Sequence, residues 1–175
     1  MRIRRLAECS LMLSLIIIGA YIKIPIPYVP FSLQFLFVTL AGQLLGAKYG
    51  AFVVCVYIIM GLLGIPVFAS GGGVAYVLQP TFGYLIGFVF SAYVSGVITE
   101  KYYFKYYRYI ANFSAIVCMY FFGVIYMYYL YKLYFNQNLE ITEILYLGVV
   151  LQLPGDILLS IFGAKIATRI SKVRI

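Results

Sequence analysis

The sequence predicts an all-α integral membrane protein with six transmembrane helices and with its N- and C-termini both cytoplasmic. Of its 175 residues, 65% are hydrophobic and 10% are charged, whereas about a quarter of the residues in a soluble domain are charged. The mean hydropathy is +1.01. No hydrophilic stretch is long enough to form a second domain, so we expect residues 1–175 to form a single membrane domain.

Six apolar segments correspond to the six expected helices. The second and third are short for a span, which needs about 20 residues. The first has no small-residue cleavage pattern, so we interpret it as a membrane span and not as a signal peptide. In chain order the segments are Leu6–Ile22, Phe31–Leu45, Gly50–Leu63, Gly83–Thr99, Tyr109–Tyr131 and Ile144–Thr168.

The distribution of basic residues predicts the orientation in the plasma membrane. With the N-terminus inside, only Lys23 and Lys132 of the 13 lysines and arginines face outward, as the positive-inside rule requires. An even number of spans then places both termini in the cytoplasm. The net charge of +8 does not indicate nucleic-acid binding, because the basic residues flank spans that contact membrane lipid and do not form a stripe with stacking aromatics.

The stretch Gly61–Phe88 interrupts the helical pattern. It contains Pro66 and the consecutive glycines Gly71, Gly72 and Gly73, and a helix does not continue through such a set. The surrounding residues are apolar and aromatic, and non-helical backbone at membrane depth is stable only where protein buries it or a cavity faces it. The stretch therefore predicts the wall or lid of a small-molecule pocket, with an ordinary external turn as the alternative.

Asp156 is the most informative single residue. It is a carboxylate deep inside an apolar run, where an ionisable group is costly unless it is paired or faces a polar cavity. We expect Pro154 and Gly155 to kink the helix just before it. Gln152 lies one helical turn earlier on the same face. The pattern favours a ligand site, and the alternative is a structural kink with a capping aspartate.

A proline-rich segment precedes the second span. Pro25, Pro27 and Pro30 prevent a helix between Ile24 and Phe31. Gln34 follows this segment, just inside the span, which makes it a candidate ligand contact. A hydrogen bond between helices is the alternative role for such a residue.

Polar residues also gather where the fourth span begins. Thr81 can cap this helix with its hydroxyl, and a helix N-terminus with free N–H groups is a suitable place for a ligand carboxylate. Gln79 and Tyr84 lie near the same level. Helix capping alone is the alternative role for Thr81.

The first span carries Ser10 and Ser14, four residues apart. Small residues at this spacing let helices approach closely in lipid. The pair predicts either a docking face for another membrane subunit or packing within the same bundle.

Several motifs together resemble the BioY family, the biotin-binding S components of energy-coupling factor vitamin transporters. In chain order they are VPFSLQFLFVTLAGQLLGAKYGAF, YIIMGLLGIPVFASGGG, PTFGYLIGF and LPGD. The resemblance implies high-affinity biotin uptake together with a transmembrane coupling protein and two ATP-binding-cassette ATPases. It also implies that the glycine loop closes over the ligand, that Asp156 binds it, and that Ser10 and Ser14 contact the coupling protein.

Two positions depart from the family pattern. Leu159 stands where the family usually has a lysine in Asp-x-x-Lys, and Phe82 stands where a glycine is common and could narrow the pocket. These changes leave open another small heterocyclic ligand, such as lipoate or dethiobiotin.

Other classes of function receive less support from the residues. The chain has no Walker A pattern, so a partner must supply ATP hydrolysis. A proton-coupled carrier that works through Asp156 without an ATPase remains an alternative. With no histidine and one embedded carboxylate, the chain offers no catalytic constellation, and we expect no enzyme activity, no metal site and no cofactor.

Overall fold

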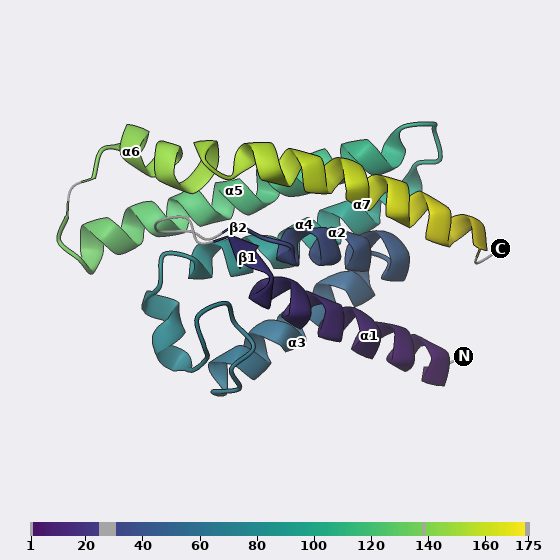
Figure 1. Ribbon diagram of the computed structural model, residues 1–175, viewed down its shortest axis with the longest axis horizontal. Helices are drawn as coiled ribbons and strands as arrows, with labels where there is room; N and C mark the ends of the chain where they lie inside the picture. The colour runs from purple at the N-terminus through teal and green to yellow at the C-terminus, as the bar shows by residue number, and fades with distance from the viewer. Residues whose placement is uncertain (1, 25–30, 138, 174–175) are drawn as a thin grey trace.

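The computed structural model describes residues 2–24, 31–137 and 139–173, and these residues are largely helical (Figure 1). A two-residue antiparallel ladder follows the first helix, and a short 3₁₀ turn precedes the fourth. The elements are α1 (Arg2–Tyr21), β1 (Lys23–Ile24), β2 (Phe31–Ser32), α2 (Gln34–Leu45), α3 (Ala47–Leu62), η1 (Val74–Leu78), α4 (Phe82–Lys101), α5 (Tyr107–Leu133), α6 (Ile141–Leu145), the π turn η2 (Tyr146–Val150) and α7 (Leu153–Val173).

Each predicted apolar segment is mainly helical where the structure describes it, which confirms the six-helix architecture. The exceptions are the strand residues Phe31 and Ser32, the π turn Tyr146–Val150 and a few turn or bend residues beside these elements or at segment ends. Three helical stretches are long and apolar enough to cross a membrane: α4, α5 and the continuous run Ile141–Lys172, which combines α6, η2 and α7. The helices α2 and α3 are apolar but shorter, as the sequence predicts. The first turns of α1 carry charged residues, including Arg4, Arg5 and Glu8.

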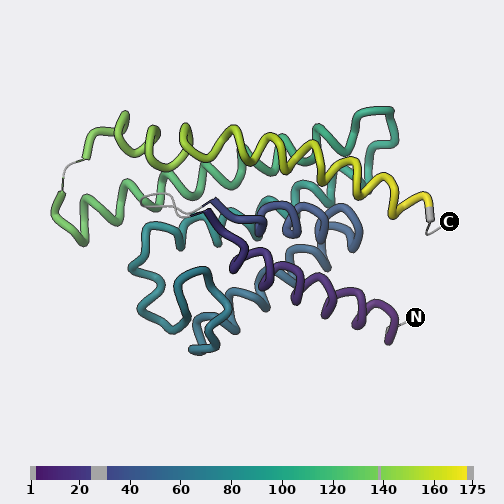
Figure 2. The backbone as a smooth tube through the Cα atoms, in the orientation of Figure 1, coloured from purple at the N-terminus to yellow at the C-terminus, as the bar shows by residue number. Residues whose placement is uncertain are grey.

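The helices lie mainly along the long axis of the molecule. Helix α5 and the stretch α6–α7 run side by side, and α4 packs against α2, α3 and α5 (Figures 1 and 2). The start of α1 and the end of α7 lie at the same end of the long axis (Figure 1). The chain therefore begins and ends at one end of the helical bundle.

The buried core consists of aromatic and aliphatic side chains from most helices. Ile16, Phe35, Tyr57, Phe68 and Met127 are at most 2% exposed. Large apolar side chains also cover much of the outer surface. Because lipid is as apolar as these side chains, an exposed apolar exterior is what a membrane-embedded bundle requires.

A buried polar network joins α2, α5 and α7 near the end that holds the chain termini. Arg108 donates to Gln43 Oε1 at 3.2 Å and to Ser171 Oγ at 2.7 Å, while Asn112 Nδ2 donates to the Ser160 carbonyl at 2.7 Å. Gln43 also donates to Asn112 Oδ1. Satisfied polar networks of this kind fix helices in one arrangement.

The two predicted breaks in the helical pattern have different outcomes. The prolines at 25, 27 and 30 lie outside the described residues. The flanking strands pair Lys23 with Ser32 and Ile24 with Phe31. The glycine-rich break is confirmed as non-helical: α3 ends at Leu62, and an irregular loop follows that contains an isolated bridge between Phe68 and Gly71.

Candidate small-molecule site

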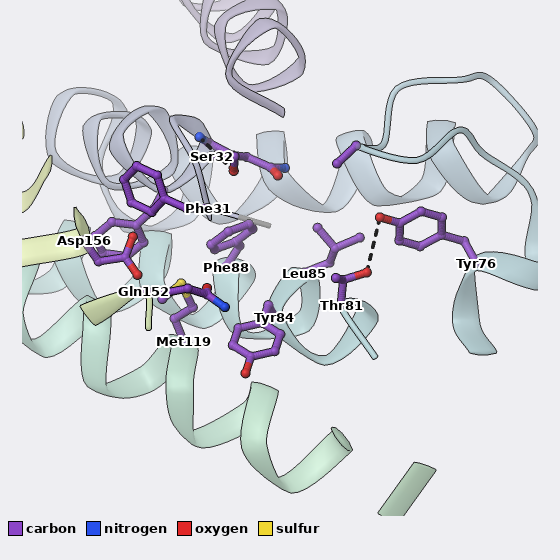
Figure 3. Close-up of a pocket in the computed structure, with 13 residues that line it drawn as sticks. Phe31, Ser32, Tyr76, Thr81, Tyr84, Leu85, Phe88, Met119, Gln152 and Asp156 are labelled. Atoms are coloured by element: carbon purple, nitrogen blue, oxygen red, sulfur yellow. Dashed lines mark hydrogen bonds between the residues drawn. The ribbon is translucent and has the colours of Figure 1, made fainter. Parts of the chain in front are cut away.

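A narrow cavity opens among the starts of α2, α4 and α7 and the middle of α5 (Figure 3). It contains about 540 Å³ of empty space, of which about 50 Å³ is wide enough for the centre of a water molecule. The second of these volumes is well below the range of about 300–1,000 Å³ that is usual for small-molecule pockets, so the lining residues have to move apart before a vitamin-sized ligand fits. Its lining residues are Phe31, Ser32, Gln34, Phe35, Ala69, Tyr76, Thr81, Tyr84, Leu85, Phe88, Met119, Gln152 and Asp156.

Asp156 and Gln152 form one polar end of this cavity. Asp156 lies in the first turn of α7 and is 4% exposed, and Gln152, also 4% exposed, lies one turn earlier. The Tyr120 hydroxyl of α5 donates to Asp156 Oδ2 at 2.5 Å. A charge-assisted bond of this length holds a carboxylate firmly, so Tyr120 fixes the direction in which Asp156 faces the cavity.

The predicted kink at Pro154 and Gly155 is wrong in position, because α7 is regular there and a π turn lies earlier in the chain. The residues Tyr146–Val150 of η2 are wound more loosely than an α-helix, and α7 begins again at Leu153. Pro154 falls in the first turn of α7, where its missing N–H costs nothing. The Tyr84 hydroxyl donates to the Gly148 carbonyl in this turn at 2.9 Å, so α4 holds the turn in place.

Gln34 supplies an unused amide beside the cavity. Its side chain is 4% exposed and lines the cavity at the start of α2. The Nε2 atom is buried and has no hydrogen-bond partner among the described residues. Because a buried amide without a partner is costly, this group is well placed to bind a polar ligand atom.

The glycine loop supports the cavity from one side without lining it. Gly71 and Gly73 have φ values of +111° and +107°, a region that only glycine adopts readily. The Gly73 N–H donates to the Gly61 carbonyl at 2.7 Å, which fastens the loop to α3. The glycines thus shape a loop whose Ala69 reaches the cavity, together with Tyr76 of the following turn.

The predicted site residues fall into two groups. Gln34, Thr81, Tyr84, Gln152 and Asp156 converge on one cavity, although they come from distant parts of the sequence. Gln79 does not join them, because it is exposed at the end of η1 with an extended backbone. The glycines Gly71, Gly72 and Gly73 also stay outside the lining.

The expected helix cap by Thr81 is wrong, and the hydroxyl groups of both Thr81 and Tyr84 have partners within the protein. Thr81 precedes α4 but makes no side-chain capping bond; its hydroxyl lies 3.3 Å from that of Tyr76 instead. The Tyr84 ring lines the cavity, but its hydroxyl is engaged by Gly148. Neither hydroxyl is therefore left free to bind a carboxylate in the manner the sequence suggested.

The two positions that depart from the family pattern lie outside the cavity lining. Leu159 is half-buried and packs with Leu36 and Ala167. Phe82 packs on the Tyr126 ring, with the ring centroids 5.7 Å apart. The expectation that Phe82 narrows the pocket is therefore wrong, because its ring is directed to α5.

The sequence did not identify the apolar walls or Tyr120. Phe31, Phe35, Phe88 and Met119 line the cavity, but each looks like an ordinary core residue in an apolar run. Tyr120 is one of 19 tyrosines. Only its spatial approach to Asp156 distinguishes it.

The predicted docking residues lie on the outer surface of α1. Ser10 and Ser14 are exposed, and the Ser14 hydroxyl donates to the Ser10 carbonyl at 3.0 Å. The Ser14 hydroxyl is thus satisfied within the helix, and both small side chains form a strip that is open to the surroundings. Packing within the bundle, the alternative role, does not account for an exposed pair.

A helical membrane bundle that encloses a narrow cavity with a buried carboxylate is characteristic of a multi-pass membrane protein that binds a small molecule. The family comparison makes this more specific. The chain belongs to the BioY family, whose model matches residues 1–174.

Individual relatives agree with this assignment. A probable biotin transporter BioY of Lysinibacillus sphaericus is 41% identical, over 96% of this chain and 87% of that protein. The biotin transporter BioY of Lactococcus lactis is 30% identical, over 98% and 92%. A crystal structure of the S component for biotin from an ECF-type ABC transporter superposes with a TM-score of 0.83 at 28% identity, covering 98% of this chain and 92% of that one.

These findings confirm the predicted family. They also confirm that the chain belongs among transporters and not enzymes, because the relatives carry the names of transporters.

Proposed function

We propose that the protein captures biotin with high affinity and takes it up across the plasma membrane as the S component of an energy-coupling factor transporter. Relatives named as biotin transporters and a similar biotin S component support this assignment. The observation that carries it is the pairing of Asp156 with the unpartnered amide of Gln34 beside one cavity. An acceptor and a donor together suit a cyclic urea, which has N–H donors and a carbonyl acceptor.

The cavity supports a specific binding geometry. Asp156 accepts a hydrogen bond from the ureido N–H groups of biotin, and the Gln34 amide donates to the ureido oxygen. Because Asp156 and Gln34 are each only 4% exposed, such bonds contribute more than they would in bulk solvent. Phe31, Phe35 and Phe88 provide an apolar wall for the thioether ring.

The proposed orientation places both termini in the cytoplasm and the mouth of the cavity outside. The shared location of the two chain ends and the excess of basic residues around them support it. The exposed strip at Ser10 and Ser14 then contacts a transmembrane coupling protein, to which two ABC-type ATPases supply energy.

An uptake assay tests the proposal. Labelled biotin should accumulate in biotin-auxotrophic cells that express this chain together with a coupling protein and both ATPases. It should not accumulate when an ATPase carries a Walker A substitution. Uptake that persists with the inactive ATPase and collapses when the proton gradient is dissipated would instead indicate a proton-coupled carrier.

A further inference from the structure

Lys23 is an exposed residue of β1 that contacts two residues of the cavity lining. In the β1–β2 ladder it is paired with Ser32, and its ammonium group donates to the carbonyl oxygen of Ala69. Both Ser32 and Ala69 line the cavity. We propose that Lys23 binds the carboxylate of the ligand tail and is the residue that makes the site select an acid over a neutral analogue.

The cavity has two polar ends separated by an apolar middle. Asp156 and Gln152 lie at one side in Figure 3, and Tyr76 and Thr81 lie at the other, with Phe88 and Leu85 between them. A ligand whose urea head contacts Asp156 therefore extends its tail toward Tyr76 and Thr81. Ala69, whose carbonyl accepts from Lys23, lines the same cavity. This inference rests on the proposed function for the identity of the ligand.

The polar groups at the tail end leave the carboxylate few alternatives. The Thr81 hydroxyl donates to that of Tyr76, and the Tyr84 hydroxyl donates to the Gly148 carbonyl. Of these three hydroxyl groups only that of Tyr76 keeps a proton for a carboxylate, and it carries no charge. Lys23 is a basic residue that contacts the cavity lining, through its bond to the Ala69 carbonyl. Two other basic side chains contact residues outside the cavity lining: the Lys132 ammonium lies 5.6 Å from the ring centre of Tyr128, and the buried Arg108 contacts Gln43 and Ser171.

Lys23 is chemically available for an anion. Within the described residues the one ion pair is Arg4–Glu8, so the ammonium of Lys23 has no carboxylate partner there. An ammonium has three donors, and the bond to Ala69 uses one of them. A ligand carboxylate can therefore bind Lys23 while the lysine still holds the loop.

A second contact fastens the same loop to the end of α1. The Tyr21 hydroxyl donates to the Pro66 carbonyl. The loop from Pro66 to Ala69 is thus attached through two side chains that lie close together in sequence. Because Lys23 has both a structural contact and a proposed ligand contact, the test has to separate the two roles.

The experiment measures the affinity of the purified full-length protein for biotin and for biotin carboxamide, in which a neutral amide replaces the tail carboxylate. The variants are Lys23→Gln, Lys23→Arg and, as a matched control, Lys132→Gln. Lys132 is an exposed lysine outside the cavity lining. The wild-type protein should prefer biotin about tenfold, as expected for one hydrogen bond between charged groups.

In Lys23→Gln this preference should disappear while the affinity for the carboxamide stays unchanged, and Lys23→Arg and Lys132→Gln should keep the preference. A Lys23→Gln protein that still prefers the acid tenfold would overturn the proposal. An equal loss for both ligands would also overturn it, because it would show that Lys23 only holds the loop. If the wild-type protein bound neither ligand, the proposed function itself would be wrong.

Discussion

The chemistry of the site depends on how one buried carboxyl group is held. Asp156 has no basic partner among the described side chains, and its Oδ2 atom accepts a hydrogen bond from the Tyr120 hydroxyl at 2.5 Å. The Tyr120 ring in turn packs edge-on against Tyr84, with the centroids 6.3 Å apart. These contacts fix Asp156 from α5 and α4, so that it faces the ligand without a cation beside it.

Replacing Asp156 by asparagine should weaken biotin binding by about ten- to a hundredfold, because a hydrogen bond to a charged group contributes roughly 1.5–3 kcal/mol. Calorimetric titration of the purified variant measures the change. Glu143→Gln is the control, since Glu143 is an exposed carboxylate on α6. Equal affinities of Asp156→Asn and the wild-type protein would refute the role of Asp156.

Replacing Tyr120 by phenylalanine removes one hydroxyl and leaves the ring. We expect biotin affinity to fall about three- to tenfold, less than for Asp156→Asn, because the hydroxyl acts on the ligand only through the carboxylate. In the double variant the Tyr120 substitution should add little. Tyr129→Phe, at an exposed position on the same helix, should bind like wild type, and an unaltered affinity in Tyr120→Phe would argue against the positioning role.

For single residues, the sequence indicated members of the cavity lining most clearly where a polar residue interrupts an apolar run. Asp156, Gln152 and Gln34 stand out for that reason, and all three line the cavity. Tyr120 and Lys23 do not stand out, because tyrosines and interfacial lysines are common in membrane proteins. Their roles depend on contacts with residues that are far away in the sequence.

At the scale of elements, the glycine loop is held by an aromatic anchor. Phe68 is fully buried, and its ring lies 5.4 Å from that of Tyr57 on α3 and 4.4 Å from that of Tyr76. The Tyr57 hydroxyl also donates to the Val67 carbonyl at 3.1 Å. The loop is thus attached to α3 by an edge-on aromatic contact and by a hydrogen bond, both from Tyr57.

Phe68→Ala should destabilise this loop, since removing a buried phenylalanine costs roughly 3–5 kcal/mol in protein cores. We expect a lower denaturation temperature in detergent together with weaker biotin binding, because Ala69 and Tyr76 lose their support. Phe121→Ala is the control, as Phe121 is 60% exposed on α5. A Phe68→Ala protein with wild-type stability and affinity would show that the loop is anchored in another way.

The helices could be predicted because long apolar runs specify them, whereas local details could not. The π turn before α7 arises where Tyr84 of α4 meets the Gly148 carbonyl, a contact between residues 64 positions apart. The Thr81 cap failed for a similar reason, since Tyr76 takes up its hydroxyl. The first is a tertiary contact, whereas the second is a contact between residues five positions apart that replaces the expected cap.

At the scale of the whole molecule, the ligand cavity and the proposed docking face lie on different parts of the bundle. The cavity is formed by the starts of α2, α4 and α7, whereas the small residues of α1 lie on the outside. The network of Arg108, Gln43 and Asn112 joins α2 to α5 near the end of the bundle that holds the chain termini. Its members are dispersed in the sequence, so composition alone does not reveal them.

Substituting leucine for Ser14 should separate binding from transport. A bulky side chain on the exposed strip of α1 prevents close helix contact, so uptake should be lost while the biotin affinity of the isolated protein is unchanged. Uptake by cells that express the complete transporter, compared with binding by the purified subunit, measures this separation. Val117→Phe, on the exposed face of α5, should leave both intact, and normal uptake by Ser14→Leu would exclude this face as the docking surface.

The most direct test of the central claim is calorimetric titration of biotin into the purified protein, with lipoate and dethiobiotin as competitors. We predict tight, saturable binding at one site per chain and weaker binding of lipoate, which has no urea group to contact Asp156 and Gln34. No binding of biotin, together with saturable binding of lipoate, would contradict the claim that this cavity recognises biotin.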